Sequence, residues 1–447
     1  MHGTDRRPWG LIVAAVFALS ACMALYTLGD IRTHLLRYYA LITAVMAVMM
    51  LAYRAWDILA GDNDRRAVNI VIGAAIVFRV ALLGLQPSLS DDLFRYAWDG
   101  HLVAHGINPY AYVPADPKLA GERNEAYPRI AYKDYHSLYP PLMEAGLGAA
   151  AWLSETVFHG SMRAMFVIWK LMLIGAELVS LLLLARLLAF WKMPARRLLL
   201  YAWHPLPIIE FAGQGHSDAL MITGMLWCVW ALARAKRGEG MLGYAFAIAT
   251  RWVPLVFAPV LGRFMGWPRM ILGVIIACAL TLPFYSPAAW RGLVDSTLHM
   301  GQSFVFNGFG FWILYGLCEL FHTWSLEPYI TAFLASVFVA GLFAIARRQG
   351  AFTPAMIPQR MLIVCTLFVL VVWNMHPWYF TWGLALVPLA FSWGWLWVSF
   401  VSQFTYVHYT PRSDAALLIA GIVEYGGFIA LLIAQRRFDV ARNTPRG

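Results

Sequence analysis

Long apolar runs recur along this chain of 447 residues and leave few folds open to it. Apolar residues make up 61% of the sequence and charged residues 13%, whereas a soluble globular protein carries about 25% charged residues. An apolar run of about 18 residues or more is long enough to cross a bilayer as a helix. Because backbone polar groups in lipid need partners within the chain, continuous runs predict helices and not the alternating strands of a barrel. The sequence therefore predicts an all-α polytopic membrane protein.

The apolar runs and the basic residues between them predict a topology. With the N-terminus inside, most arginines of the short loops fall on the cytoplasmic side, as the positive-inside rule requires. Both termini are then cytoplasmic, and about 12 to 14 transmembrane segments surround a large first extracytoplasmic loop. The expected spans cover residues 9–29, 35–56, 67–86, 163–190, 198–213, 217–234, 270–284, 328–346, 360–375, 377–391, 394–408 and 415–434.

The N-terminal basic residues Arg6 and Arg7 and the segment around Cys22 also resemble a cleaved leader. The apolar run there is about 20 residues long, which favours a retained anchor.

Two further stretches have to depart from simple crossings. Residues 141–158 are apolar but begin with proline and carry two glutamates, which predicts an interfacial or re-entrant helix on the outside. Residues 241–262 are interrupted at Arg251 and Pro254, which predicts two half-helices with Arg251 at their apex. We expect one transmembrane domain over residues 1–447, with outer loops at residues 87–162 and 285–327, of which the first is polar enough to form an ordered cap.

Composition also excludes several classes of function. The net charge of +10 comes from loop arginines that set topology, so it does not indicate nucleic-acid binding. All five cysteines lie in apolar stretches, which predicts free thiols. The chain has no Walker loop, no dinucleotide-binding glycine motif and no zinc spacing. Chemistry on the outer side, where ATP is absent, then needs a pre-activated donor delivered by the membrane.

The strongest candidate for chemistry is the segment SDDLFRYAWDGHLVAHGINPYAYVP, residues 90–114, which directly follows an apolar span. Its adjacent carboxylates, Asp91 and Asp92, lie where charged groups lose part of their hydration. One of them is expected to cap the following helix. A partly desolvated carboxylate beside another tends to have a raised pKa, which suits a general base, so a catalytic role is favoured.

Three other groups of polar residues follow apolar spans. Glu210 and Asp218 flank a glycine-rich turn that carries His216, and they form either a structural hydrogen-bond cluster or a substrate-lining one. Arg251 is either a snorkelling arginine paired with an acid or an anchor for phosphate. His376 joins two spans with aromatic neighbours that also fit an interfacial belt. For His299 and Asn307, in the expected second outer loop, a functional role and a structural role both stay open.

These segments resemble the GT-C superfamily of integral-membrane glycosyltransferases, and residues 90–114 are similar to its first extracytoplasmic loop. The bacterial polyprenol-phosphate-mannose-dependent mannosyltransferases are the most similar branch. The resemblance extends over residues 67 to 435, and further support comes from Tyr139-Pro140-Pro141-Leu142, from His204-Pro205-Leu206 running into the segment 210–218, and from His376-Pro377-Trp378-Tyr379.

The resemblance implies an inverting transfer of mannose or another hexose. The donor would be a polyprenyl-phosphate sugar, and the acceptor a hydroxyl of a cell-envelope glycan or glycolipid at the outer face of the cytoplasmic membrane. Asp91 would be the base, and Asp92 would orient the acceptor or bind an optional divalent cation, with no other cofactor expected. Donor-phosphate binding falls to Arg251, His376 and His216, and sugar or acceptor binding to Glu210, Asp218, Asp99, His105, Tyr110, Trp378 and Tyr379.

Three other functions are compatible with a chain of this kind. A transporter or flippase of a lipid-linked saccharide would show inverted repeats and polar sites near the bilayer midplane. Here repeats are not evident and the acids gather at one face, which favours an enzyme. A ligase that transfers a whole glycan and an inactive accessory subunit are the remaining alternatives.

Overall fold

The computed structural model describes residues 8–61, 64–303, 305–321, 326–347, 353–411 and 413–443, so Arg6 and Arg7 lie outside it. The side chain of His299 is also outside the described part. Regular structure in the described ranges is helical, apart from isolated bridges that join Phe306 and Asn307 to Asn374. The predicted all-α fold is confirmed.

Seven helical segments in the described ranges are long and apolar enough to cross a membrane. Three shorter apolar helices accompany them, over Asp218–Ala233, Val253–Met265 and Phe309–Leu320. The chain is a multi-pass membrane protein, as its apolar runs predict. The seven segments are Trp9–Leu28, Ile31–Arg54, Met162–Phe190, Trp267–Phe284, Tyr329–Arg347, Pro354–Val371 and Asp414–Asp439.

The chain divides into two compact units, each assembled from segments that are far apart in the sequence. We call residues 1–78, 184–208 and 305–447 the first unit, and residues 79–183 and 209–304 the second unit. The expectation of one transmembrane domain stays a prediction. Helices α4 (Asp64–Ala81) and α7 (Met162–Phe190) contribute to both units.

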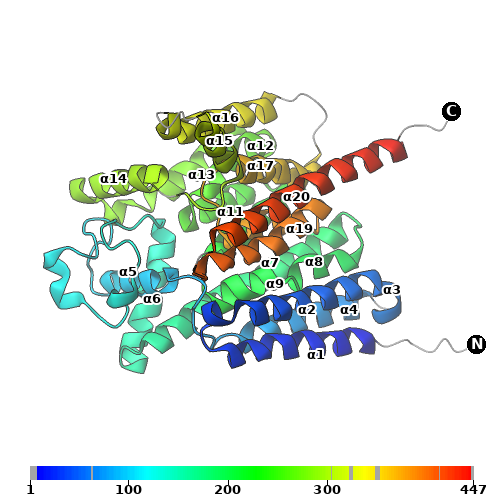
Figure 1. Ribbon diagram of the computed structural model, residues 1–447, viewed down its shortest axis with the longest axis horizontal. Helices are drawn as coiled ribbons and strands as arrows, with labels where there is room; N and C mark the ends of the chain where they lie inside the picture. The colour runs from blue at the N-terminus through cyan, green and yellow to red at the C-terminus, as the bar shows by residue number, and fades with distance from the viewer. Residues whose placement is uncertain are drawn as a thin grey trace, which may run out of the picture. The chain divides into compact units, whose positions relative to one another are not determined.

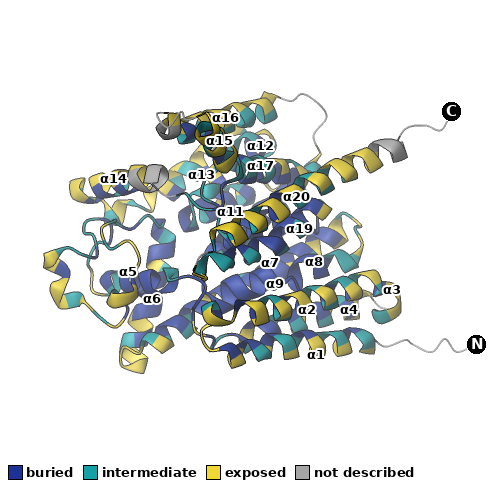
Figure 2. Ribbon diagram, viewed as in Figure 1, coloured by how far each residue is buried: buried dark blue, intermediate teal, exposed yellow. Residues whose placement is uncertain are grey.

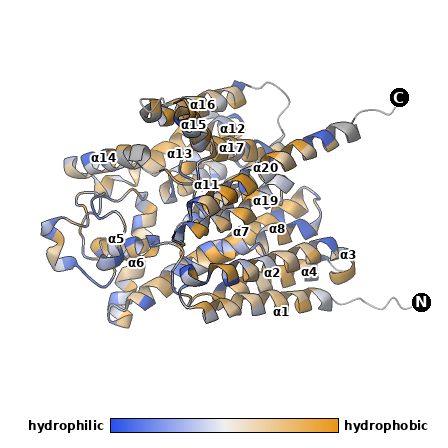
Figure 3. Cartoon of the chain, in the orientation of Figure 1, coloured by the Kyte–Doolittle hydropathy of each residue, from blue (hydrophilic) through white to orange (hydrophobic). Residues whose placement is uncertain are grey.

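The first unit is a set of helices in which a few are fully enclosed. Helices α1 and α2 pack side by side, and α19 packs against α20. Figure 2 shows α19 largely buried and α20 exposed along much of its surface. Figure 3 shows α20 apolar over most of its length and hydrophilic toward its C-terminal end, as expected for a membrane helix that emerges into water. The helices of this unit are α1 (Trp9–Ala24), α2 (Leu35–Arg54), α3 (Trp56–Leu59), α4, α8 (Leu199–Ala202), α9 (Pro205–Pro207), α15 (Phe309–Leu320), α16 (Glu327–Arg347), α17 (Ile357–Val371), α18 (Thr381–Leu384), α19 (Trp393–Val401) and α20 (Asp414–Asn443).

Some expected spans of the first unit are built from short helical pieces instead of single helices. This holds for residues 198–213, 377–391 and 394–408. Proline lacks a backbone N–H and clashes with the preceding turn, so Pro205 and Pro207 account for the interruption in the first of these. The full number of crossings stays a prediction.

The second unit contains the first outer loop and the helices that hold it. Helices α5 and α6 pack against each other (Figure 1). Helix α10 packs against α11, which also contacts α6 and α13. The unit is thus organised around two helix pairs joined through α11. Its helices are α5 (Asp92–Ala104), α6 (Pro141–Phe158), α7, α10 (Asp218–Ala233), α11 (Arg237–Thr250), α12 (Ala258–Met265), α13 (Trp267–Ala279) and α14 (Pro287–Ser303).

The helix break predicted at Arg251 is confirmed. Helix α11 ends at Thr250, Arg251 has extended backbone angles (φ −162°, ψ 137°), and a 3-10 turn over Val253–Phe257 leads into α12. Residues 141–158 form the single helix α6, which is not among the candidate spans of the described chain. The membrane sides of both segments stay predictions.

Residues 87–162, which are expected to form the first outer loop, are folded, as their composition predicts. Trp98 and Leu102 on α5 form a hydrophobic cluster with Leu119 and Ile130 of the loop. Leu119 lies in a short 3-10 turn over Pro117–Glu122, and Ile130 directly follows another over Tyr127–Arg129. Burying these side chains fixes the loop over α5, whose first residue is Asp92.

The stretch expected to form the second outer loop, residues 285–327, is largely helical. It contains α14 in the second unit and the apolar helix α15 in the first unit. Its assignment as one extracytoplasmic loop stays a prediction.

Candidate active site

A side-chain clamp holds the segment before the acidic pair. The backbone N–H groups of Ser88 and Leu89 both donate to Gln214 Oε1, at 2.9 and 2.8 Å. The next residue, Gly215, accepts a hydrogen bond from Trp169 Nε1 at 2.8 Å. These buried bonds join residues that are 126 and 125 positions apart in the sequence.

The turn that carries His216 follows a π-helix over Ile208–Gly213. Such wide turns are rare and frequently lie at functional sites. The N–H of His216 donates to the carbonyl of Glu210 at 2.9 Å, which closes the turn. Gly215 has φ +84°, and a Cβ there would lie 2.9 Å from Leu93 Cδ1, so the turn requires glycine.

His216 lies between two carboxylates. Its Nδ1 is 3.0 Å from Glu210 Oε2, and its Nε2 is 3.7 Å from Asp92 Oδ2. The side chains of His216 and Glu210 are completely buried, whereas 36% of the Asp92 side chain is exposed. Glu210 therefore fixes the orientation of the imidazole. Asp92 is the solvent-accessible end of this row of three side chains.

Arg251 adds a guanidinium to the same cluster. Its Nε lies 3.1 Å from Asp218 Oδ1, and its Nη1 donates to Ser217 Oγ at 3.2 Å. The Asp218 side chain is fully buried and that of Arg251 is 14% exposed. Arg251 is thus paired with an acid, as the first of its two interpretations required, and the pair holds a planar set of N–H donors in a fixed position. Its role as an anchor for phosphate stays a prediction.

The surroundings of Asp92 shift its ionisation. Burial raises the pKa of the Asp92 carboxyl above its ordinary value, while the positive charges of His216 and Arg251 oppose this rise and Asp218 adds to it. The carboxylate is in contact with solvent on one side and enclosed by protein on the others. Substrate that fills the exposed side would desolvate it further.

Asp91 has different neighbours from Asp92. Its Oδ1 lies 3.3 Å from Arg129 Nη2, and both side chains are partly exposed. The guanidinium of Arg129 in turn lies over the ring of Phe94, 3.8 Å from its centroid. The two adjacent carboxylates thus contact separate basic side chains, Arg129 at the rim of the site and His216 inside it.

The expectation that one aspartate caps α5 is wrong. Asp91 occupies the N-cap position without a side-chain capping bond, and Ser90 Oγ accepts the N–H of Asp92 at 3.1 Å. The serine satisfies the helix end, so neither carboxylate is assigned to capping.

The structure places three other predicted site residues in different contacts. Asp99 is buried and receives the Nε–H of Arg95 at 2.9 Å. Tyr110 donates its hydroxyl to the carbonyl of Tyr139. His105 lies beside two glutamates at the C-terminal end of α5. Their roles in binding sugar or acceptor stay predictions, and the contacts of Asp99 and Tyr110 are those of structural residues.

The remaining predicted residues belong to the first unit. The His376 ring is stacked between Phe306 and Trp378, with centroid distances of 4.8 and 4.4 Å, and Tyr379 meets it edge-on at 5.7 Å. Trp378 is buried. This aromatic group orders the His376 imidazole, and its relation to the acidic pair stays a prediction. In the same unit, Asn307 Nδ2 donates to Glu424 at 3.0 Å.

Sequence reasoning missed several residues of the site. Arg129 comes from an irregular loop without periodicity, so nothing in the sequence connects it to Asp91. Gln214 lies within the segment 210–218, but its bonds to Ser88 and Leu89 depend on the folded turn. Glu144 is one of the two glutamates of the expected interfacial helix, and the structure shows it buried and hydrogen-bonded to Ser137. Only long-range packing reveals these partners.

Residues 10–267 match the protein family described as alpha-(1->6)-mannopyranosyltransferase, N-terminal domain. The chain belongs to this family. The matched region includes the acidic pair, the turn with His216, and Arg251. A search of curated proteins found no match. This membrane protein is therefore a glycosyltransferase of a mannosyltransferase family, and the predicted resemblance to that class is confirmed.

Proposed function

We propose that the protein transfers mannose, with inversion, from a polyprenyl-phosphate donor to a hydroxyl of a cell-envelope glycan or glycolipid at the outer face of the cytoplasmic membrane. One observation carries this proposal: the acidic pair lies beside a cluster of basic side chains. Asp92 Oδ2 lies 3.7 Å from His216 Nε2, and Arg251 belongs to the same cluster. A sugar bound there would have a carboxylate and a set of phosphate-binding donors beside its reacting carbon.

The two carboxylates divide the work. Inversion requires the base and the leaving group to lie on opposite faces of the sugar. Asp92 contacts His216, the candidate phosphate ligand, while Asp91 contacts Arg129 at the exposed rim. Asp91 is therefore assigned to the acceptor side, where it takes the hydroxyl proton as the new bond to the anomeric carbon forms. Asp92 orients the sugar and holds the cations.

The leaving group is a phosphate monoester of the lipid. Breaking the bond from the anomeric carbon to the phosphate oxygen leaves additional negative charge on the phosphate. Donors that are already positioned stabilise this charge without reorganising, and such electrostatic stabilisation is usually the largest contribution to rate. Arg251 is held by Asp218 and Ser217, and His216 is held by Glu210, so both are positioned before substrate arrives.

The stereochemistry constrains the donor. The family description specifies an α-(1→6) product. Because inversion converts a β-linked donor into an α-linked product, the proposed donor is the β-linked mannosyl phosphate. A retained α-linkage from an α-linked donor would contradict the inverting part of the proposal.

The optional divalent cation at Asp91 and Asp92 fits these residues poorly. Asp91 faces the guanidinium of Arg129, and Asp92 faces the imidazole of His216. A metal ion would have to displace these contacts, so no step of the reaction is assigned to one there.

The test uses the full-length protein purified in detergent or nanodiscs. Labelled β-mannosyl polyprenyl phosphate and a nucleotide-linked mannose are supplied separately with an α-mannoside acceptor. We expect transfer from the lipid donor alone, with a product whose new linkage is α-(1→6) by methylation analysis. Transfer from the nucleotide sugar alone would contradict the proposal.

Variants of the acidic pair test the roles. Asp91→Asn is expected to retain donor binding and lose transfer by about 10²–10⁴-fold, the usual contribution of a general base. Asp134→Asn, at an exposed aspartate of the same loop, is the matched control and should leave transfer unchanged. Full transfer by Asp91→Asn would rule out this base. Movement of intact lipid-linked saccharide across vesicles, without transfer, would identify a flippase.

A further inference from the structure

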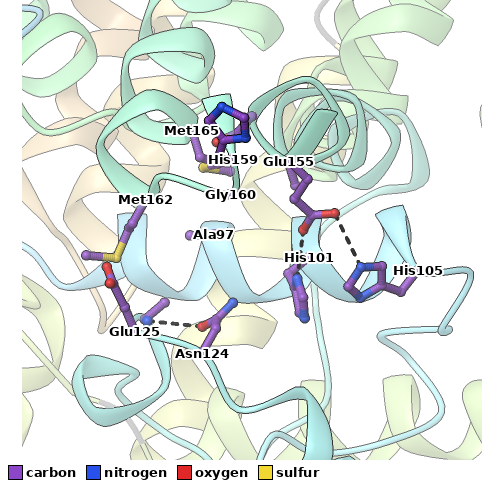
Figure 4. A pocket seen from close by; sticks show the side chains of 13 residues that line it. Ala97, His101, His105, Asn124, Glu125, Glu155, His159, Gly160, Met162 and Met165 are labelled. Atoms are coloured by element: carbon purple, nitrogen blue, oxygen red, sulfur yellow. Dashed lines mark hydrogen bonds and ion pairs between the residues drawn. The ribbon is translucent and has the colours of Figure 1, made fainter. Parts of the chain in front are cut away.

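A second cluster of titratable side chains lies at the other end of α5. His101 and His105 are four residues apart on this helix and therefore lie on one face. Glu155 from α6 faces both of them (Figure 4): its Oε1 is 2.8 Å from His101 Nδ1, and its Oε2 is 3.3 Å from His105 Nε2. Two imidazoles and one carboxylate, from two helices, thus converge on one point.

The distances suit a small divalent ion. A tetrahedral zinc ion with ligands at about 2.0–2.1 Å separates those ligands by about 3.3–3.4 Å. One candidate ligand atom from each of the three residues lies within 4.8 Å of the others. Contacts of 2.8 and 3.3 Å are therefore close to the separations required, and small side-chain rotations would complete the geometry.

A fourth residue supplies the support that metal-binding histidines usually have. Glu122 Oε2 lies 3.2 Å from His101 Nε2 and 3.2 Å from His105 Nδ1. These are the ring nitrogens that do not face Glu155. Histidine ligands commonly donate their second ring N–H to a carboxylate, which fixes the ring and its tautomer. Glu122 is positioned to do this for both rings at once.

Ion pairs alone account for the cluster less well. They require protonated imidazoles, and the two rings are only 4.2 Å apart between centroids. Two positive charges at that distance repel. A metal ion binds neutral imidazoles and supplies the positive charge that two facing carboxylates need.

An ion can reach this cluster from solvent. The side chains of His105, Glu122 and Glu155 are 43%, 32% and 29% exposed. His105 and Glu155 border a cavity of about 480 Å³ whose wall also includes His159 and Met162 (Figure 4). The fourth coordination position of an ion held by His101, His105 and Glu155 would face water.

We propose that His101, His105 and Glu155 bind a divalent transition-metal ion, of which Zn²⁺ is the best match, and that Glu122 orients the two histidines. Imidazole and carboxylate ligands together favour zinc over calcium or magnesium. The ion joins the C-terminal end of α5 to α6. At about 1.5 Å per residue, His101 lies about 14 Å along the helix from Asp92, so the site is separate from the acidic pair. Sequence spacing alone does not reveal this metal site, because the third ligand, Glu155, comes from another helix.

Metal content tests the proposal without an activity assay. The full-length protein in detergent is stripped with a chelator and titrated with Zn²⁺ against a chromophoric competitor. We expect one equivalent per chain. Glu155→Gln and His105→Gln should weaken binding at least about 100-fold, and Glu122→Gln about 10–100-fold. His159→Asn is the matched control, since Asn tolerates its left-handed conformation (φ +55°) and it borders the same cavity.

A measurement on the unaltered protein covers the case in which a variant fails to fold. Histidine modification followed by mass spectrometry should show His101 and His105 protected by Zn²⁺, and His159 not protected. Binding below half an equivalent, or equal modification with and without zinc, would overturn the proposal. Loss of zinc binding in Asp92→Asn with retention in Glu155→Gln would move the ion to the acidic pair and would overturn it as well.

Discussion

The two ends of α5 carry similar side chains in different surroundings. At the N-terminal end, Asp92 meets His216, which is completely buried and held by a buried glutamate. At the C-terminal end, His105 and its two glutamates are partly exposed. Charges enclosed by protein act on one another strongly and cannot relax, whereas exposed ones are screened and can rearrange. The first end is suited to stabilising a transition state, and the second to exchanging an ion with solvent.

The largest effect is expected from the cation at the enclosed end. Arg251→Gln should lower kcat about 10²–10³-fold, as the loss of one preorganised donor does in other enzymes. Arg251→Lys keeps the charge but not the fork of donors and should recover part of the rate. Steady-state transfer from the lipid donor measures both. Equal rates in wild type and Arg251→Gln would remove Arg251 from the phosphate site.

A smaller loss is expected when the support of His216 is removed. Glu210→Gln keeps the shape of the side chain and removes the charge that orients the imidazole. Losing the buried carboxylate charge 3.0 Å from His216 Nδ1 should lower kcat about 10–100-fold, which is equivalent to about 1.4–2.7 kcal/mol. KM for the lipid donor should change less than kcat if Glu210 acts by positioning. A change in KM alone would indicate that Glu210 binds the sugar directly.

Between the two ends, Glu144 on α6 offers a test by pH. Burial, reinforced by Asp99, raises the pKa of the Glu144 carboxyl well above its ordinary value, so the folded state favours the protonated form. The stability it contributes is present below its ordinary pKa and is lost as pH rises through the raised value. Glu144→Gln resembles the protonated form and should raise Tm at about pH 9 and not at about pH 5, by about 2–4 °C for each kcal/mol gained. An equal shift at both pH values would contradict this.

The smallest effect on transfer is expected at the exposed end. His105→Gln in metal-free buffer should change kcat less than about threefold, because screened charges about 20 Å along the helix direction from Asp92 contribute little to the reaction. The same variant should lose zinc-dependent thermal stabilisation. A loss of transfer as large as that of Arg251→Gln would show that the two ends of α5 are not separable.

Much of the fold follows from local patterns, and most of the site does not. Continuous apolar runs predict the membrane helices, and a charge beside Pro254 predicts the break at Arg251. The grouping of Glu210, His216 and Asp218 follows from their place in one turn. By contrast, the pairing of Asp91 with Arg129 and the convergence of His101 with Glu155 depend on how an irregular loop folds over α5. Sequence spacing carries no information about such contacts.

The π-helix before the turn that carries His216 determines which changes in chain length this segment can accept. A π-turn holds one residue more than the α-turn it replaces, so its conversion to regular α-helix would follow from a single deletion within residues 208–213. Each residue of an α-helix advances the chain by about 100° of rotation. Such a deletion would turn Glu210 out of register with His216 while leaving the apolar character of the segment intact. The number of residues in this segment therefore sets the alignment of Glu210 with the His216 imidazole. Insertions and deletions here should be far less tolerated than substitutions.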